Sequence, residues 1–308
     1  MGFGRMAAGL GLAAAVCCGC SSGQAPRAER ASASVPPAGP SSTAAPTASP
    51  TAVPVKPKKF DKAALDRELR RYLGGRASGA GIHVLDRTTG RRYSYRPDTE
   101  FVTASVAKLD ILMTLLLKRQ KAHRGLSADE KYDAGIMIRE SDNFAADRNF
   151  RRAGSATGVN AANRRSFRLK HTEAIDAQCL DLLCWSLTRT TPRDQERLME
   201  NLFSGPLERK HRDFVLGLMS EVVKDQRWGV GAGALKGDRV YNKNGWMTHQ
   251  RDGDRWAVNS VGRIEGHGHD LLVAVMTNHN PSMGYGITTA EHLVARVADA
   301  FRATTPAV

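Results

Sequence analysis

One stretch constrains the fold more than any other: residues 101–112, with the sequence Phe-Val-Thr-Ala-Ser-Val-Ala-Lys-Leu-Asp-Ile-Leu. It predicts a short extended segment that turns into a helix ending at about Lys121. Ser105 and Lys108 are three residues apart and therefore share one face of this helix. Branched apolar side chains would bury the helix in a core, and they are Leu109, Ile111, Leu112, Leu115 and Leu116.

Ser105 and Lys108 are a candidate nucleophile and base. A serine hydroxyl attacks poorly until a neighbouring base takes its proton, and a desolvated lysine can be that base. Burial favours the neutral form of the amine. The free N–H groups at the start of the helix offer a place for an oxyanion. Ser-x-x-Lys is a common pattern, so a capped amphipathic helix without chemistry is the alternative for the pair taken alone.

The first twenty residues predict export. Arg5 precedes an apolar run over residues 6–16, which is too short to span a membrane and ends at Cys17-Cys18-Gly19-Cys20. This pattern indicates a signal peptide over residues 1–20. Its end resembles a bacterial lipobox, so Cys20 is the expected lipid anchor, holding the protein on the outer face of the cell membrane. Cys17 and Cys18 compete for that role, and plain cleavage with secretion is the alternative.

Residues 21–58 are rich in Ala, Pro, Ser and Thr and carry almost no apolar bulk, which predicts a disordered tether. The folded domain is expected over residues 59–305. The formal net charge is +14. The sequence lacks a basic stripe interleaved with aromatic residues, which argues against nucleic acid as the partner. An exported protein meets anionic lipids and wall polymers instead.

Two cysteines remain in the expected folded domain, Cys179 and Cys184. A close pair in an oxidising compartment predicts a disulfide. Two buried free thiols are the alternative.

Strand patterns occur at both ends of this domain and helical patterns between them, which predicts one sheet with a helical lobe inserted. The middle, from residue 154 to 185, carries no clear period. Helices are expected over 60–73, from 105 to about 121, from 127, from 144, from 191, between 208 and 223, and over 288–303. Strands are expected over 79–86, 91–96, 229–244, 256–264 and 271–277.

Two further motifs carry polar chemistry. Ser141-Asp142-Asn143 offers a hydroxyl, a carboxylate and an amide at a helix end, although such a tripeptide is usually a capping cluster. Lys243-Asn244-Gly245-Trp246 ends a predicted strand. The glycine would let a ligand lie against the strand, and the lysine brings a fixed charge. An exposed edge lysine before a turn is the alternative.

The three motifs follow one another in a definite order: Ser-x-x-Lys, Ser-Asp-Asn, then Lys-x-Gly before a C-terminal helix. In this order, over roughly residues 60–305, the chain resembles the serine penicillin-recognising superfamily and specifically class A β-lactamases. Phe101 and Thr190-Thr191-Pro192-Arg193 add to the resemblance. It implies an α/β fold (an α+β sandwich), with a mixed, largely antiparallel sheet flanked by helices and an inserted all-helical lobe.

The resemblance implies an acyl-enzyme mechanism. Ser105 becomes acylated, Lys108 is its base or proton relay, and Ser141 passes a proton to the leaving nitrogen. Release of the acyl group depends in the family on a loop glutamate. Residues 168–173 resemble the segment leading to it, so Glu173 is the candidate water-activating base. The Leu-Asn of the family does not follow Glu173, and an exposed loop carboxylate is the alternative.

Substrate-binding roles follow from the same resemblance. Asn143 would hold the substrate amide, and Lys243 would attract the substrate carboxylate. The N–H groups of Ser105 and Trp246 would form the oxyanion hole. Asn244 replaces the Thr or Ser of the family, and its amide can still donate to the carboxylate.

The expected activity is β-lactam hydrolysis by a monomer that needs no cofactor and no metal. The expected partners are a β-lactam or another small peptidoglycan-derived substrate, and the membrane through a lipid anchor. A D-Ala-D-Ala peptidase or amidase acting on wall material, and a slow-turnover penicillin-binding sensor, are the alternatives. The interval of 36 residues from Ser105 to Ser141 is shorter than in class A enzymes, which predicts that a loop over one wall of the cleft is missing.

Overall fold

The computed structural model describes residues 59–179, 182–249 and 253–304. Its main sheet has five strands in the order β2-β1-β9-β8-β7, and every neighbouring pair is antiparallel. The sheet is therefore antiparallel throughout, which confirms the largely antiparallel sheet implied by the resemblance. Its strands are β1 (Gly79–Asp86), β2 (Arg92–Tyr95), β7 (Arg239–His249), β8 (Arg255–Gly266) and β9 (His269–Asn280).

The helices lie where the sequence predicted them, with α5 added in the segment that carried no clear period. They are α1 (Lys62–Gly74), α2 (Ala107–Lys121), α3 (Ala128–Arg139), α4 (Asn143–Ala153), α5 (Ser155–Ala162), α6 (Pro192–Ser204), α7 (Arg209–Ser220) and α8 (Met283–Arg302). Shorter elements connect them: β3 (Phe101–Val102), η1 (Ala104–Val106), η2 (Asn163–Phe167), β4 (Gln178–Cys179), β5 (Leu182–Leu183), η3 (Cys184–Leu187), β6 (Arg189–Thr190), η4 (Lys224–Gln226) and η5 (Gly229–Gly233).

The strand expected from Gly229 begins ten residues later, at Arg239. Residues 229–233 form the 3-10 turn η5 instead, and Gly229 has a φ of +81°, outside the region of regular extended backbone. A side chain at Gly229 would also collide with Ser260, so this turn packs directly on β8. The expected strand was wrong here because the glycines serve close packing rather than extension.

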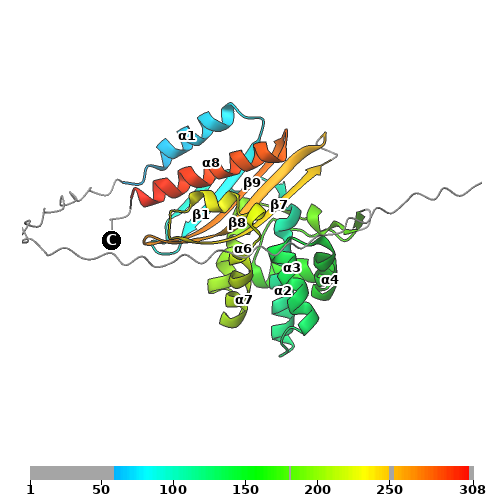
Figure 1. Cartoon of the computed structure of the whole chain (residues 1–308). Coiled ribbons are helices and arrows are strands. Elements are labelled where there is room, and N and C mark those ends of the chain that lie inside the picture. The colour runs from blue at the N-terminus through cyan, green and yellow to red at the C-terminus, as the bar shows by residue number, and fades with distance from the viewer. Residues whose placement is uncertain (1–58, 180–181, 250–252, 305–308) are drawn as a thin grey trace, which may run out of the picture. The chain divides into compact units, whose positions relative to one another are not determined.

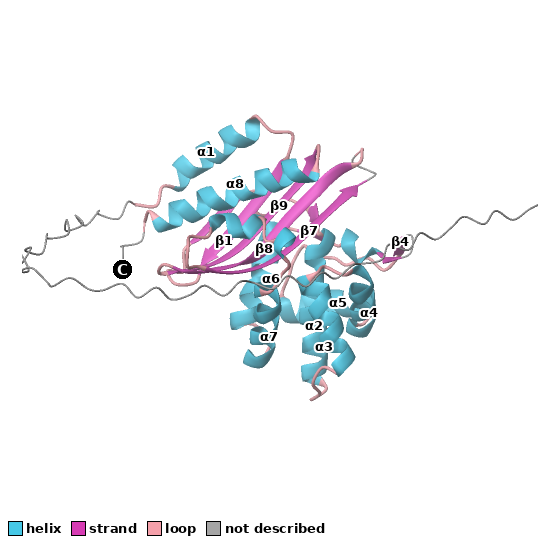
Figure 2. Ribbon diagram, in the orientation of Figure 1, coloured by secondary structure: helices cyan, strands magenta, loops and turns pink. Residues whose placement is uncertain are grey.

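Helices cover both faces of the sheet (Figures 1 and 2). On one face lie α1 and α8; on the other lie α6 and the helical region built around α2. The central strand β9 feeds both cores, because neighbouring side chains of a strand point to opposite faces. Leu272, Ala274 and Met276 join the core of the helical region, and Leu271, Val273 and Val275 join the core under α8.

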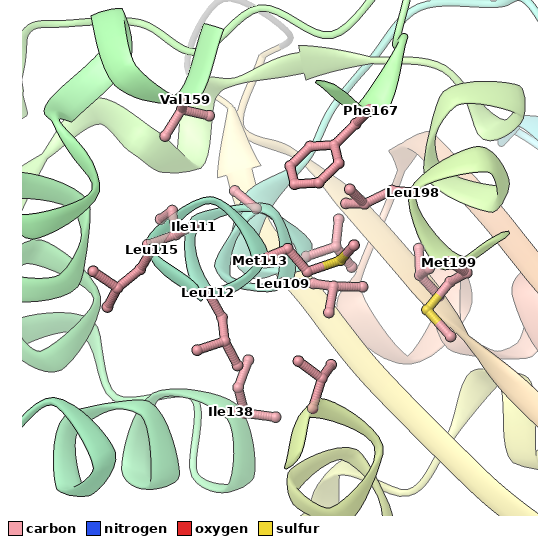
Figure 3. Close-up of a cluster of buried hydrophobic side chains, with 14 of the residues drawn as sticks. Leu109, Ile111, Leu112, Met113, Leu115, Ile138, Val159, Phe167, Leu198 and Met199 are labelled. Carbon is pink, nitrogen blue, oxygen red and sulfur yellow. The ribbon is translucent and has the colours of Figure 1, made fainter. Parts of the chain in front are cut away.

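Helix α2 is the centre of the helical region, and apolar side chains surround it on all sides (Figure 3). Every residue from Ala107 to Leu117 is buried. A helix that is buried all round has no solvent face, so its few polar residues need partners inside the protein. Each fully buried leucine contributes about 1.5–3 kcal/mol relative to exposure, which holds this helix in place beneath the sheet.

Candidate active site

The backbone that leads to Ser105 is held in an uncommon conformation. Ala104 has a φ of +47°, a left-handed value that costs a non-glycine residue energy unless its surroundings impose it. Asn259 on β8 does so in part, because its amide donates to the carbonyls of Val102 (2.9 Å) and Thr103 (3.1 Å). The hydroxyl of Ser105 therefore emerges from η1, a short 3-10 turn, immediately before α2 begins.

Lys108 lies beneath this hydroxyl and is fully buried. Its Nζ is 3.0 Å from Ser105 Oγ, 3.0 Å from Ser141 Oγ and 2.8 Å from Asn143 Oδ1. Burial lowers the pKa of the Lys108 amine from 10.5 to about 7, while the negative charges of Asp142 and Asp147 act in the opposite direction. At neutral pH a large fraction of this amine is therefore free to accept a proton.

The Ser-Asp-Asn motif lies at the junction of α3 and α4. Ser141 has a φ of +61°, which turns its hydroxyl and its carbonyl toward Lys108. Asp142 caps α4 by accepting from the N–H of Ala145 at 2.6 Å, the role that the sequence offered as the alternative reading. Asn143, the first residue of α4, then reaches the amine of Lys108. The cap and the polar site thus share one tripeptide.

A second buried amine completes the cluster. Lys243 on β7 is fully buried, and its Nζ lies 3.0 Å from Ser141 Oγ and 2.7 Å from the backbone oxygen of Asn244. Burial, and secondly the charge of Lys108, hold the pKa of Lys243 well below its usual value. One hydroxyl therefore bridges two amines from different elements, an arrangement in which a proton can pass through Ser141.

Gly245 brings the edge strand β7 against η1. A Cβ at this position would lie 2.7 Å from the backbone nitrogens of Ser105 and Val106, so only glycine permits the approach. Trp246 follows and lines the space beside Ser105. The sequence predicted that this glycine lets a ligand lie against the strand. In the structure it lets the backbone of η1 lie there.

Asn244 faces away from this space. Its Nδ2 donates to the carbonyls of Gln226 (2.9 Å) and Trp228 (3.0 Å), and its Oδ1 accepts from Ser260 Oγ at 2.6 Å. All of its amide groups are committed to the loop behind β7. The expectation that this amide donates to a substrate carboxylate therefore does not fit its position, because strand alternation places Asn244 opposite Lys243 and Gly245.

Glu173 also lies apart from the cluster. Its backbone pairs with Arg189, and its carboxylate forms an ion pair with the Arg189 guanidinium at 2.8 Å. The side chain is 60% exposed. Glu173 thus lies beside β6 with its carboxylate exposed, as in the alternative interpretation of an exposed loop carboxylate.

A pocket of about 210 Å³ opens beside Ser105, and no carboxylate is among the described residues that line it. Its lining is Ala104, Ser105, Asn143, Leu183, Trp185, Ser186, Trp246 and Met247. Within the described ranges, no group of His, Cys, Asp and Glu side chains is arranged to hold a metal ion.

Two residues of this region were missed in the sequence. The ring of Trp185 lies 4.8 Å from Lys108 Nζ, and its Nε1 donates to Asp147 Oδ1 at 2.6 Å. Asp147 is four residues after Asn143 on α4, so helical spacing could have placed both on one face. Trp185 gave no comparable signal, because it lies in the segment without a period.

The cysteine predictions fall partly outside the described residues. Cys184 is disulfide-bonded. Its pairing with Cys179 stays a prediction, since the side chain of Cys179 is not among those described. Cys20, with its competitors Cys17 and Cys18, precedes the described part of the chain. None of the described helices combines the length and the apolar character that a bilayer span requires.

Solved structures with this fold include β-lactamases and a penicillin-binding protein. The TLA-1 extended-spectrum β-lactamase is 16% identical, with a TM-score of 0.69 over 78% of this chain and 99% of that chain. A variant of PBP-A, solved as an acyl-enzyme complex with penicillin G, is 20% identical, with a TM-score of 0.65 over 77% and 96%. At these identities the likeness shows the fold alone.

The sequence comparisons show the family. "Putative lipoprotein LppW" of Mycobacterium tuberculosis is 30% identical over 176 residues, or 54% of this chain. The chain spans about half the length of the curated relatives it matches, 53% in this case. The profile of the Beta-lactamase enzyme family matches residues 64–135 and 131–304, nearly all of the described part. The chain belongs to this β-lactamase enzyme family.

Proposed function

We propose that the protein is an active-site serine hydrolase that opens β-lactam rings by acylating Ser105. The observation that carries the proposal is the burial of Lys108, whose amine has a pKa of about 7 and lies 3.0 Å from Ser105 Oγ. A neutral amine at this distance can take the hydroxyl proton as the oxygen attacks. A buried lysine whose hydrogen-bond partners include no carboxylate is costly, so its place beneath Ser105 supports a catalytic role.

The reaction follows from the positions of the three polar groups. Ser105 Oγ attacks the lactam carbonyl carbon and its proton passes to Lys108. Collapse of the tetrahedral intermediate breaks the carbon–nitrogen bond, and Ser141 Oγ gives its proton to the departing nitrogen. Lys108 then returns a proton to Ser141, with which it shares a 3.0 Å contact. Lys243 Nζ, 3.0 Å from Ser141 Oγ, is a second amine with which this hydroxyl can exchange a proton.

The oxyanion would lie between the N–H groups of Ser105 and Trp246. Strand β7 is at the edge of the sheet, so one row of its backbone groups has no strand partner. The carbonyl of Asn244 faces the site, because it accepts from Lys243. The N–H and C=O of alternate residues point the same way along a strand, which directs the N–H of Trp246 to the same side.

The position of Glu173 favours a second candidate, in which the acyl-enzyme forms but is hydrolysed slowly. Rapid release needs a base beside the attacking water, and such a base contributes about 10²–10⁴-fold. The carboxylate expected in that role is exposed and paired with Arg189. A penicillin-binding sensor or a D-Ala-D-Ala peptidase would match this arrangement better than an efficient β-lactamase.

Exposure of the purified protein to benzylpenicillin, followed by intact-protein mass spectrometry over time, tests both candidates. An adduct of the mass of the opened antibiotic, mapped to the peptide containing Ser105, supports acylation. Its rapid disappearance favours the β-lactamase and its persistence favours the slow-turnover candidate. Absence of any adduct, with the antibiotic unconsumed, would refute the proposal.

We also propose that the protein is a lipoprotein anchored through Cys20, with residues 21–58 as the tether to the folded domain. The curated relative named as a lipoprotein supports this location. Cys20→Ser should move the protein from the membrane fraction to the medium in its native host. A wild-type protein that is already released without lipid would contradict the anchor.

A further inference from the structure

The loop before α6 presses one indole against the catalytic amine. We call residues 182–190 the Trp185 loop. Trp185 is 2% exposed, its ring centroid is 4.8 Å from Lys108 Nζ, and it lines the pocket beside Ser105. The buried indole thus lies against the amine and forms part of the pocket wall beside Ser105.

Asp147 fixes this indole from α4. It accepts from Trp185 Nε1 at 2.6 Å and from the N–H of Leu183 at 3.2 Å, and it is itself buried. A buried carboxylate that receives two donors from one loop ties that loop to α4, and the Arg151 guanidinium lies 3.9 Å from its other oxygen. Cys184, between the two donors, is disulfide-bonded.

The other end of the Trp185 loop is tied to the backbone that leads to Ser105. Thr188 donates to the carbonyl of Trp185 through its N–H (3.2 Å) and its hydroxyl (2.7 Å). Thr103 in turn donates its N–H to the carbonyl of Thr188 at 2.9 Å and its hydroxyl to that of Ser186 at 3.3 Å. Contacts at both ends of the Trp185 loop therefore fix the position of the indole relative to Ser105.

Hydrolysis of an ester on Ser105 needs a water molecule next to the carbonyl carbon and a base to take its proton. The water oxygen bonds to the acyl carbon, the bond from that carbon to Ser105 Oγ breaks, and the proton passes through the base to Oγ. Lys108 is the base within reach of Oγ. An indole face offers water no strong hydrogen bond, so a water placed between Trp185 and this amine would be poorly held.

We propose that Trp185 is a positioning residue that keeps water away from the Ser105 ester and so prolongs the life of the acyl-enzyme. This inference rests on the proposed function, because it concerns the fate of the acyl group on Ser105. Beyond packing, the Trp185–Asp147 pair would set the rate at which water, rather than another acceptor, removes the acyl group.

The test measures the decay of the benzylpenicillin adduct after removal of free antibiotic, in the full chain and in the series Trp185→Phe, Trp185→Leu and Trp185→Ala. We expect decay to quicken as the side chain shrinks, by about tenfold or more in Trp185→Ala, a fraction of what a positioned base and water contribute. Trp185→Phe keeps a ring over the amine and should stay near the wild type. In water enriched in ¹⁸O the released acid should carry one label.

Phe150→Leu is the matched control for loosened packing. Phe150 is buried on the same helix as Asp147 and belongs to the apolar core. It should lower the melting temperature while leaving the decay rate of the adduct unchanged. If Trp185→Ala does not fold, the smaller loss in Trp185→Leu still decides the question.

The outcomes separate the two proposals. An adduct that forms in every variant and decays at one common rate overturns the shielding role and leaves acylation standing. Slower decay in Trp185→Leu or Trp185→Ala also overturns it. A wild-type protein that never forms an adduct overturns both. The shielding role is supported if decay of the adduct quickens in the Trp185 variants and stays unchanged in Phe150→Leu, even where both changes lower the melting temperature.

Discussion

The two sides of Ser105 differ in the chemistry of the side chains that line them. On one side, two hydroxyls and two fully buried amines form a chain of contacts. Each group is 3.0 Å from the next, in the order Ser105 Oγ, Lys108 Nζ, Ser141 Oγ and Lys243 Nζ. On the other side, an indole covers the amine and the nearest expected carboxylate, Glu173, faces solvent. Forming an acyl bond and releasing it make separate physical demands, and in the proposed mechanism the polar groups serve the first. We call their side the acylation side, and the side of Trp185 and Glu173 the release side.

The largest effect is expected from removing the nucleophile. Ser105→Ala should abolish covalent labelling by a fluorescent penicillin. Among the described residues that line the pocket, Ser105 is the one whose hydroxyl forms a hydrogen bond with Lys108. The melting temperature should stay close to the wild type, since the change removes one oxygen from the pocket wall. Labelling that survives in this variant would show that another residue is acylated and would dissolve the distinction between the two sides.

The acylation side was readable from the sequence because its parts lie on strongly patterned elements. The apolar period that predicted α2 also fixed the depth of Lys108, and the order of the motifs placed Ser141 and Lys243. The alternation of β7 could also have shown that Asn244 faces away from Lys243. Sequence reasoning overlooked this because the motif was compared with a family pattern rather than with its own strand.

The release side was not readable for a physical reason. The Trp185 loop has no period, and its conformation depends on a contact between Trp185 and Asp147, which are 38 residues apart. Such a contact leaves no local pattern in either segment. Resemblance alone makes Glu173 the candidate water-activating base. The direction of its side chain depends instead on the backbone pairing of Glu173 with Arg189.

A pH profile tests the electrostatics of the acylation side. Burial lowers the pKa of Lys108 to about 7, and in the proposed mechanism the neutral amine is the active form. Below that pH the reactive fraction falls, so the second-order rate constant for acylation should drop about tenfold per pH unit and level off above it. Stopped-flow labelling between pH 5 and 9 would show this. A rate that keeps rising to pH 9 would mean that the amine is protonated at neutral pH.

Asn244→Ala probes the support behind the acylation side. The change removes the acceptor of the buried Ser260 hydroxyl. It also removes one of the two donors to the carbonyls of Gln226 and Trp228, to which Asn242 still donates. Unsatisfied buried groups cost about 1–3 kcal/mol, so the free energy of unfolding should fall by that order in urea titrations. Affinity for substrates with and without a carboxylate should change to the same extent. A selective loss for the carboxylate-bearing compound would restore Asn244 to the binding site.

The smallest effect is expected at Glu173, which the family resemblance offers as the candidate water-activating base. Its carboxylate is exposed and its partner is the equally exposed Arg189, and such pairs contribute only ~0–1 kcal/mol. Glu173→Gln should therefore leave the stability, the rate of acylation and the decay of the adduct unchanged within about twofold. The Trp185 variants serve as the positive control, because they show whether the assay detects a change in the decay rate of the adduct. Accumulation of the acyl-enzyme in Glu173→Gln would show that acylation swings this segment inward. The two sides of Ser105 would then be distinct only before the first bond forms.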